Sequence, residues 1–174
     1  MRSCSRRGFL TGLAAFGLAG CGRGSTRTEH IDLSRLDPPI DYVLGGDRPK
    51  YVEKARAWLV PIPKAALSRA EALLPFSLHD GIRAGLLAVS DICPNDKVQL
   101  VFCPTSLWFE CPGCGSKFNA FGDFKAGPAP AGMSLVPLDI GRDGTVAAST
   151  RAPLSGLARG VHLINQDAAG PHCA

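Results

Sequence analysis

The sequence lacks an excess of charge over most of its length, and this absence excludes one class of partner. Its 174 residues carry 19 Lys and Arg against 15 Asp and Glu, for a formal net charge of +4. Five of the arginines lie within residues 1–27, where no acidic residue occurs, which leaves 14 of the 19 basic residues to face all 15 acidic ones. A nucleic-acid-binding protein needs a basic face that contacts phosphates. We therefore expect no nucleic-acid partner.

An apolar run long enough to cross a bilayer is also lacking. The apolar stretch near the start, residues 9–20, is about a dozen residues long, whereas a spanning helix needs ~20. It follows Arg6 and Arg7. A positively charged start before a short apolar region is typical of an export signal. The paired arginines resemble a twin-arginine signal, a route that exports folded proteins.

A cysteine closes this segment. Residues 18–21, Leu-Ala-Gly-Cys, resemble a bacterial lipobox, in which the cysteine, here Cys21, is acylated and anchors the protein in the membrane. The alternative is a signal that is cleaved or kept as an anchor. Residues 1–21 are thus predicted to be a twin-arginine signal and lipid anchor. Residues 22–49, rich in Gly, Pro, Ser, Asp and Arg without periodicity, are predicted to be a tether. We expect the protein at the outer, periplasmic face of the cytoplasmic membrane.

Glycine and proline are abundant, at 20 and 14 residues, and favour turns and short strands over long helices. One short helix is expected at residues 64–74, where Ala, Leu, Glu and Arg precede Pro75. The chain therefore predicts an all-β domain at residues 50–150, followed by a tail at residues 151–174. The expected strands are 57–60, ended by Pro61, then 82–89, 98–102 and 107–110 around a turn, and 135–140 and 145–148 around another.

Cysteine is unevenly distributed. Of seven cysteines, Cys93, Cys103, Cys111 and Cys114 lie within 22 positions. Such clustering indicates a metal site or a disulfide, and export makes a disulfide chemically possible. Thiolates are good ligands for iron–sulfur clusters and for zinc.

Three motifs follow one another along the chain: Cys93-Pro94-Asn95, Cys111-Pro112-Gly113-Cys114 and Gly127-Pro128-Ala129-Pro130. In order and spacing they resemble those of Rieske proteins. In that family a Cys-x-His loop and a Cys-x-x-His loop hold a [2Fe–2S] cluster, and a Gly-Pro-Ala-Pro loop covers it. The resemblance extends over residues 56–146. It implies an antiparallel sandwich base with a small cluster-binding subdomain of two loops at about residues 90–130.

The ligand positions depart from the family pattern. Cys93 and Cys111 occupy the two cysteine positions, but Asn95 stands at the first histidine position and Cys114 at the second. The resemblance therefore implies three thiol ligands, Cys93, Cys111 and Cys114. The disulfide frequent in the family would join positions 98 and 113, which are valine and glycine here.

The fourth ligand is left open by the sequence. Asn95 offers an amide oxygen, a poor ligand for iron. Cys103 is chemically better, but five residues of strand place it roughly 16 Å from the loop. Folding could also bring a distant side chain to the site. The candidates are His79, His162 and, on a mobile tail, His172 and Cys173.

The substitutions also change the expected function. Without an imidazole, proton-coupled quinol oxidation is not expected. Thiolate in place of imidazole lowers the potential of a cluster, and Phe118 lacks the hydroxyl of the tyrosine that high-potential family members carry there. Ser116 can still donate a hydrogen bond to the cluster, and Gly127 and Pro128 would cover it. We expect a low-potential electron-transfer subunit of an oxidoreductase, not a complete enzyme, serving a redox partner or a membrane redox complex.

Three alternatives remain at this stage. In the first, the domain has lost its metal and serves as a structural subunit. In the second, the site holds zinc or a single iron ion, although a zinc ribbon would need a second Cys-x-x-Cys knuckle. Lastly, Cys111 and Cys114 form a redox disulfide, but a helix N-terminus that would lower the thiol pKa is not expected after them.

Overall fold

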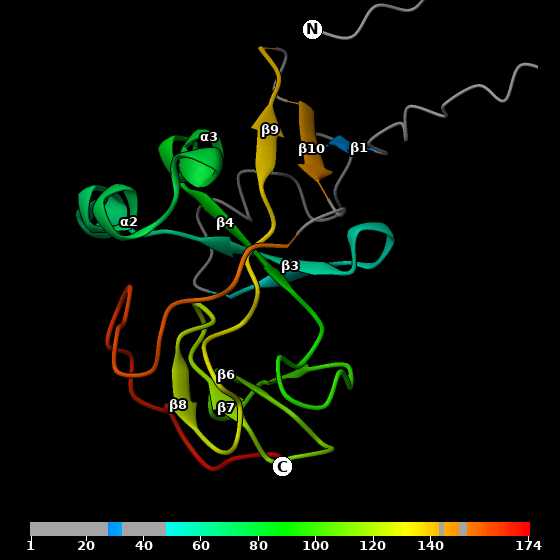
Figure 1. The fold of residues 1–174 in the computed structure, drawn as a ribbon, viewed down its shortest axis with the longest axis vertical. Helices are drawn as coiled ribbons and strands as arrows, with labels where there is room; N and C mark the ends of the chain where they lie inside the picture. Colours follow the sequence, from blue (N-terminus) through cyan, green and yellow to red (C-terminus); the bar gives the residue numbers. More distant parts are fainter. Residues whose placement is uncertain (1–27, 33–47, 143–144, 150–152) are drawn as a thin grey trace, which may run out of the picture.

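The computed structural model describes residues 28–32, 48–142, 145–149 and 153–174 (Figure 1). Within them every strand pairing is antiparallel, as predicted for an all-β domain. The strands form three sheets. In spatial order these are β1 (Thr28–Asp32), β10 (Thr145–Ser149) and β9 (Leu138–Ile140); β2 (Lys50–Val52), β3 (Ala57–Pro61) and β4 (Leu86–Ser90); and β5 (Val101–Cys103), β6 (Trp108–Glu110), β7 (Lys117–Phe118) and β8 (Phe124–Ala126).

Strands β3 and β4 separate two hydrophobic cores. Successive side chains of a strand point to opposite faces. Leu86 and Ala88 accordingly belong to a core shared with β9 and β10, whereas Leu87 and Val89 belong to a second core under the helices and the four-stranded sheet. All five residues of β4 are buried for this reason. The predicted sandwich base is therefore present, and β4 leads directly from it to the first cysteine loop.

The predicted helix at residues 64–74 is confirmed as a 3-10 turn, Lys64–Ala66, followed by α2, Leu67–Leu73. The predicted strand at residues 82–89 is wrong in its first half. A second 3-10 turn, Phe76–Leu78, leads into α3, His79–Arg83, and the strand begins only at Leu86. Gly85, with a φ of 80°, takes the left-handed conformation that commonly follows a helix end. An apolar run alone does not distinguish a buried helix end from a buried strand.

Part of the predicted tether belongs to a sheet. β1 lies within residues 22–49 and pairs with β10, with Thr28 opposite Ser149. The predicted signal, Arg6 and Arg7, and the predicted lipidation site, Cys21, lie outside the described residues. Among the described residues, no helix is both long enough and apolar enough to span a bilayer.

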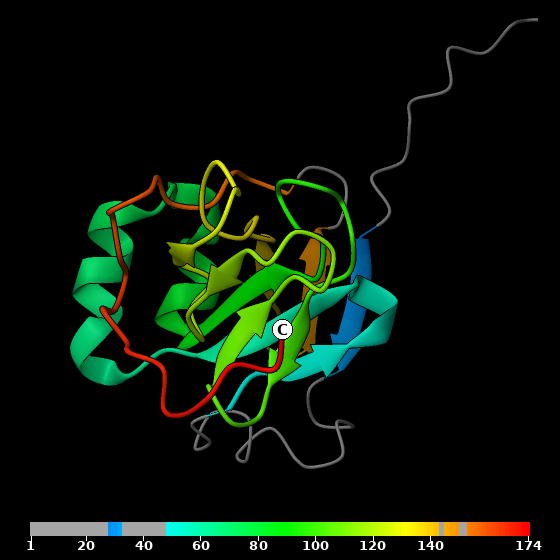
Figure 2. The same cartoon turned by 90° about the horizontal axis from the view of Figure 1, so that it is seen from below.

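Residues 153–174, predicted to be a tail, pack along the domain. Figure 2 shows this segment, in orange and red, passing beside the helices and ending at the four-stranded sheet. Arg69 of α2 donates to the carbonyl of His162 at 2.8 Å, and Asp123 Oδ2 accepts the N–H of Leu163 at 2.8 Å. Leu154 forms a bridge with Leu135. The segment is thus an integral part of the fold.

Candidate metal centre

The first cysteine loop connects β4 to β5 and folds back on itself. The N–H of Cys93 donates to the carbonyl of Val98 at 2.9 Å, and the N–H of Lys97 donates to the carbonyl of Cys93 at 3.1 Å. Lys97 reverses the chain with a φ of 64°, an uncommon conformation for a residue with a side chain. The result is a tight turn in which Cys93 is fully buried.

The second cysteine loop connects β6 to β7. The N–H of Cys111 donates to the carbonyl of Ser116 at 2.8 Å, and the N–H of Gly115 donates to the carbonyl of Cys111 at 2.9 Å. Gly115 has a φ of 71°, which glycine adopts at little cost. Cys111 is buried and Cys114 is half-buried. Both loops therefore hold their cysteines by backbone hydrogen bonds at the ends of paired strands.

The structure brings the three thiols together with a carboxylate. The Sγ atoms of Cys93, Cys111 and Cys114 and one carboxylate oxygen of Asp96 all lie within 4.8 Å of one another. Cys93 Sγ is 3.6 Å from Cys114 Sγ, and Cys111 Sγ is 3.3 Å from Asp96 Oδ1. Asp96 belongs to none of the motifs that resemble the Rieske pattern. A carboxylate three residues after the first cysteine was the available signal.

Three candidates for the fourth ligand are contradicted. Cys103 is bonded to Cys173, with their Cα atoms 5.7 Å apart, so neither thiol is free to bind a metal. His172 is also held elsewhere, with Nδ1 2.8 Å from Glu110 Oε1, and is not on a mobile tail. The reason is the packing of residues 153–174, which brings Cys173 to Cys103 on β5 and His172 to Glu110 on β6.

The remaining candidates lie as follows. His79 Nε2 is 3.2 Å from the carbonyl of Leu74, in the helical region. His162 lines a hollow with Arg69 and Pro63 next to α2. Asn95 is exposed, and the donor that its loop brings to the thiols is the adjacent Asp96. The alternative of a disulfide between Cys111 and Cys114 is not what the structure shows, because both are free thiols.

The four residues predicted to surround the site differ in their roles. Ser116 Oγ accepts a hydrogen bond from Cys114 Sγ at 3.1 Å and from the N–H of Ala129 at 3.0 Å, so it joins the second loop to the covering loop. A side chain at Gly127 would collide with the backbone of Ser116. Phe118 is fully buried and packs edge-on against Phe124. Pro128 is exposed.

Arg159 secures the covering loop, a role that no sequence motif indicates. Its Nε donates to the carbonyl of Ala129 at 2.8 Å, and its Nη2 donates to the carbonyl of Gly127 at 3.1 Å. The guanidinium also lies over the ring of Phe124, 4.3 Å from its centroid. A residue about thirty positions along the chain thereby holds the loop against Ser116.

The environment of the metal-free thiols differs from one to another. Burial raises the pKa of Cys93 to about 12 and also raises that of Cys111. Burial acts in the same direction on Cys114, but its hydrogen bonds with Ser116 outweigh burial and lower its pKa. For Asp96, burial is likewise outweighed, by hydrogen bonds from the Cys93 thiol and the N–H of Val98, and the pKa is lowered. A bound cation favours the thiolates of the two buried cysteines, because it supplies the opposite charge that their surroundings lack.

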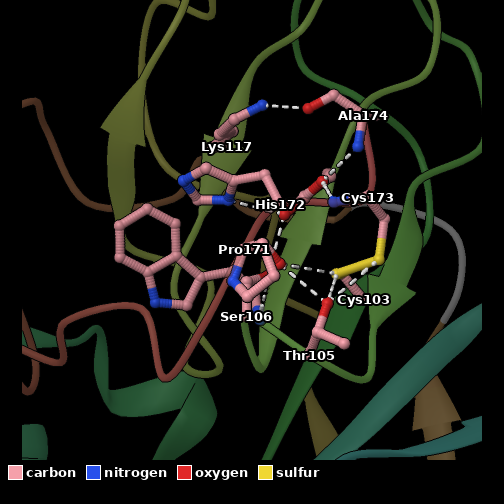
Figure 3. Close-up of a disulfide and its surroundings, with 10 residues drawn as sticks. Cys103, Thr105, Ser106, Lys117, Pro171, His172, Cys173 and Ala174 are labelled. Atoms are coloured by element: carbon pink, nitrogen blue, oxygen red, sulfur yellow. Dashed lines mark hydrogen bonds and ion pairs between the residues drawn. A yellow bond between two sulfur atoms is a disulfide. The ribbon is translucent and has the colours of Figure 1, made fainter.

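The buried carboxylate of Glu110 binds the backbone of Cys173 and Ala174. These two residues lie beside the disulfide between Cys103 and Cys173, which Figure 3 shows. Glu110 is 1% exposed. Its Oε1 accepts the hydroxyl of Ser106 at 2.8 Å, and its Oε2 accepts the N–H groups of Cys173 and Ala174 at 2.8 and 2.7 Å. Since Glu110 directly precedes Cys111, this attachment and the thiol site share the end of β6.

The attachment at Glu110 is expected to be sensitive to acid. Burial acts to raise the pKa of Glu110, but its hydrogen bonds, foremost that from the N–H of Ala174, outweigh burial and hold the pKa below its ordinary value of 4.5. A carboxyl with a depressed pKa contributes stability that is fully present above the unfolded pKa and is lost as the pH falls through the folded pKa.

Glu110→Gln should therefore flatten the decline of the unfolding free energy below pH 4.5. The measurement is thermal denaturation between about pH 6 and about pH 3. Glu71→Gln is the matched control, because this carboxylate is paired with Arg83 at an exposed position and should leave the decline unchanged. An unaltered decline in Glu110→Gln would contradict the assignment.

The spacing of the donor atoms tests which metal group fits. Four ligands around one tetrahedral ion, at a metal–sulfur distance of about 2.3 Å, lie about 3.8 Å apart. A [2Fe–2S] cluster carries its ligands as two pairs on two irons, with bridging sulfides between, so donors on different irons lie farther apart than donors on one ion. Donor atoms that are all within 4.8 Å of one another fit one ion and do not fit the two-iron cluster that the resemblance implies.

The comparisons with known proteins gave similarity to solved structures alone. No family model matches the sequence, and no curated protein matches it. The chain is similar to the plasma membrane Rieske protein PetC3 from Synechocystis PCC 6803, with 18% identity, a TM-score of 0.40 and coverage of 63% of this chain and 91% of that one. It is also similar to the soluble domain of Rieske protein II (soxF) from Sulfolobus acidocaldarius, with 19% identity, a TM-score of 0.43 and coverage of 82% and 86%. What the thiol site does has to be derived from its own side chains.

Proposed function

We propose that this chain is an exported electron-transfer protein, tethered at the outer face of the cytoplasmic membrane, with an iron centre held by Cys93, Cys111 and Cys114. The convergence of these three thiols on two hydrogen-bonded loops carries the proposal. Thiolates bind both iron and zinc, but zinc has no redox chemistry, so electron transfer requires iron. The order of the three loop motifs, which resembles that of Rieske proteins, favours iron over zinc.

The side chains around the thiols suit the transfer of an electron without a proton. No imidazole is among the four converging donors, so the site has no group that takes up a proton near neutral pH as an imidazole ligand does. Three thiolates and a carboxylate make the centre more negative than two thiolates and two imidazoles would, which lowers its potential. The buried ring of Phe118 offers no hydroxyl that would raise it. We infer a low-potential centre that does not oxidise quinols.

The half-buried Cys114 gives a redox partner its point of approach. Cys93 and Cys111 are 0% exposed, so Cys114 is the thiol of the three that reaches the surface. Val98, a large apolar side chain that is 40% exposed, lies in the facing loop. A partner protein or membrane redox complex would dock here.

Two observations support the location. Disulfides persist in oxidising compartments outside the cytoplasm, and Cys103 is bonded to Cys173 across 70 residues. The twin-arginine-like segment with Arg6 and Arg7, and Cys21 of the lipobox-like segment, supply the export route and the anchor. The alternative functions are a metal-free structural subunit and a zinc-binding or Cys-x-x-Cys thiol protein.

Metal analysis of the full chain, purified in detergent without oxygen, tests the proposal. We expect bound iron, a paramagnetic signal in one oxidation state, and a potential below about −150 mV, the lower end of the range for histidine-ligated Rieske centres. A potential above that value would contradict a low-potential centre. A folded protein without iron would instead establish the structural subunit, and zinc alone would establish the zinc-binding thiol protein.

A further inference from the structure

We propose that the centre is a single tetrahedral metal ion and that its fourth ligand is the carboxylate of Asp96. This inference rests on the proposed function in one respect, the presence of a metal at the three thiols. It differs from the cluster that the motif resemblance implies both in the number of metal ions and in the fourth donor.

The first argument is the distance between donors. Cys93 Sγ and Cys114 Sγ are 3.6 Å apart, and Cys111 Sγ is 3.3 and 3.4 Å from the two oxygens of Asp96. Two sulfur ligands on one tetrahedral ion lie about 3.8 Å apart, and a sulfur and an oxygen ligand lie closer together. The distances between these donors are close to those values. Both loops contribute two donors each, so one ion would join the loops directly.

The second argument is the space that Gly113 leaves. A Cβ atom at position 113 would collide with Asp96 Oδ2 and would lie 3.1 Å from a methyl group of Val98. Gly113 is not among the glycines with positive φ, so its backbone conformation does not require glycine. The absent side chain is thus matched to the carboxylate, which fills the gap between the two loops. In the motif resemblance, positions 98 and 113 are the ones joined by a disulfide, so Asp96 occupies the region where that bond would lie.

The third argument is how the carboxylate is held. Asp96 Oδ1 accepts a hydrogen bond from the N–H of Val98 at 3.2 Å, two residues along the chain. This side-chain-to-backbone bond is common for aspartate in turns and fixes the direction of the carboxylate. The left-handed Lys97 between the two residues makes the bond possible. Asn95, one position earlier, is exposed.

The chemistry of the donor set agrees with a single ion. Carboxylate oxygen, thiolate sulfur and a tetrahedral arrangement are all compatible with Zn²⁺ or Fe²⁺. A single ion requires no inorganic sulfide, whereas a cluster does. The analytical signature of the inference is therefore one metal per chain without acid-labile sulfide.

The test combines this stoichiometry with four variants of the full chain. Asp96→Asn keeps the size of the side chain and removes the anionic oxygen. Gly113→Ala keeps all four donors but displaces the carboxylate. Asn95→Ala is the matched control in the same loop. Affinity for Zn²⁺ and Co²⁺ is measured by competition with a chromophoric chelator, and the visible absorption of bound Co²⁺ reports tetrahedral thiolate coordination.

We expect both Asp96→Asn and Gly113→Ala to weaken affinity at least about tenfold, and Asn95→Ala to leave it unchanged. Asp96→Cys, which restores an anionic donor, should bind one Co²⁺ with a stronger sulfur-to-metal charge-transfer band. Thermal melts of the metal-free proteins verify that each variant is folded, because Asp96 and Gly113 lie in surface loops outside both hydrophobic cores.

The outcomes separate this inference from the proposed function. Two irons and two sulfides per chain would overturn the single ion and leave the electron-transfer proposal standing. One metal whose affinity is the same in Asp96→Asn would overturn the fourth ligand. One zinc that depends on Asp96, in a protein that never takes up iron, would support the site and overturn electron transfer. No metal in a folded protein would overturn both.

Discussion

Cys111→Ser is expected to reduce metal content to about a tenth or less of that of the unsubstituted protein. Cys111 is 0% exposed and its Sγ lies 3.3 Å from Asp96 Oδ1, so no donor from solvent can replace it. A serine hydroxyl is a poor ligand because it does not ionise near neutral pH, and thiolate coordination contributes much of the binding free energy of such sites, about 10–16 kcal/mol for structural zinc. Metal analysis after purification from medium supplied with iron or zinc is the measurement.

The double variant Cys103→Ser, Cys173→Ser is the control for this loss. It also removes two cysteine sulfur atoms, but they are those of the disulfide and not those of the metal site. Its metal content should therefore equal that of the unsubstituted protein. Full metal occupancy in Cys111→Ser would show that Cys111 is not a ligand and would remove the basis of the three-thiol site.

The same double variant is expected to lose about 4 kcal/mol of unfolding free energy. The disulfide closes a loop across 70 residues, and the loss of chain entropy in the unfolded state on closing such a loop has about this size. For a domain of this length the melting temperature should fall by about 8–16 °C. Thermal denaturation of the metal-free proteins measures the effect without a contribution from the metal.

Thr105→Val tests whether the loss comes from the disulfide itself. The Thr105 hydroxyl donates to the carbonyl of Pro171 at 2.7 Å, so this variant removes a contact between the same two segments but leaves the covalent bond. It should cost about 1 kcal/mol. A double cysteine variant that melts at the unsubstituted temperature would mean that the noncovalent contacts of the segment, those of Glu110 among them, hold it without the disulfide.

The sequence predicted those parts of the fold that depend on local patterns. The strand at residues 57–60 ends at Pro61, and the helix stops just before Pro75, because proline restricts its own conformation and that of its neighbour. The hairpin between Val101 and Glu110 follows from a turn between two apolar segments. Each of these features is set by residues within a few positions of one another.

The rest depends on distant contacts. The bond between Cys103 and Cys173 joins residues that no motif relates, and seven cysteines allow many pairings. The strand at Thr28–Asp32 exists because β10 offers it an edge, which nothing in its own residues indicates. Pairing over such separations is decided by the packed domain and not by local preference.

Asp96 shows a different limit of sequence reasoning. Aligning motifs position by position directs attention to Asn95, which stands at the histidine position of the resemblance. The turn at Lys97 and the missing side chain at Gly113 instead place the next residue against the thiols. Which of two adjacent polar residues faces a site depends on backbone dihedral angles, which a motif does not specify.

The covering loop introduces an order into the biosynthesis of this protein. Ala129 and Gly127 are held by Arg159, which leaves the ribosome about thirty residues after them. Until then the two cysteine loops are complete, but the covering loop lacks the hydrogen bonds from Arg159. Attachment of Cys173 to Cys103 comes later still, because the second thiol is synthesised last. The covering loop is therefore fully held only after residue 159 has been synthesised.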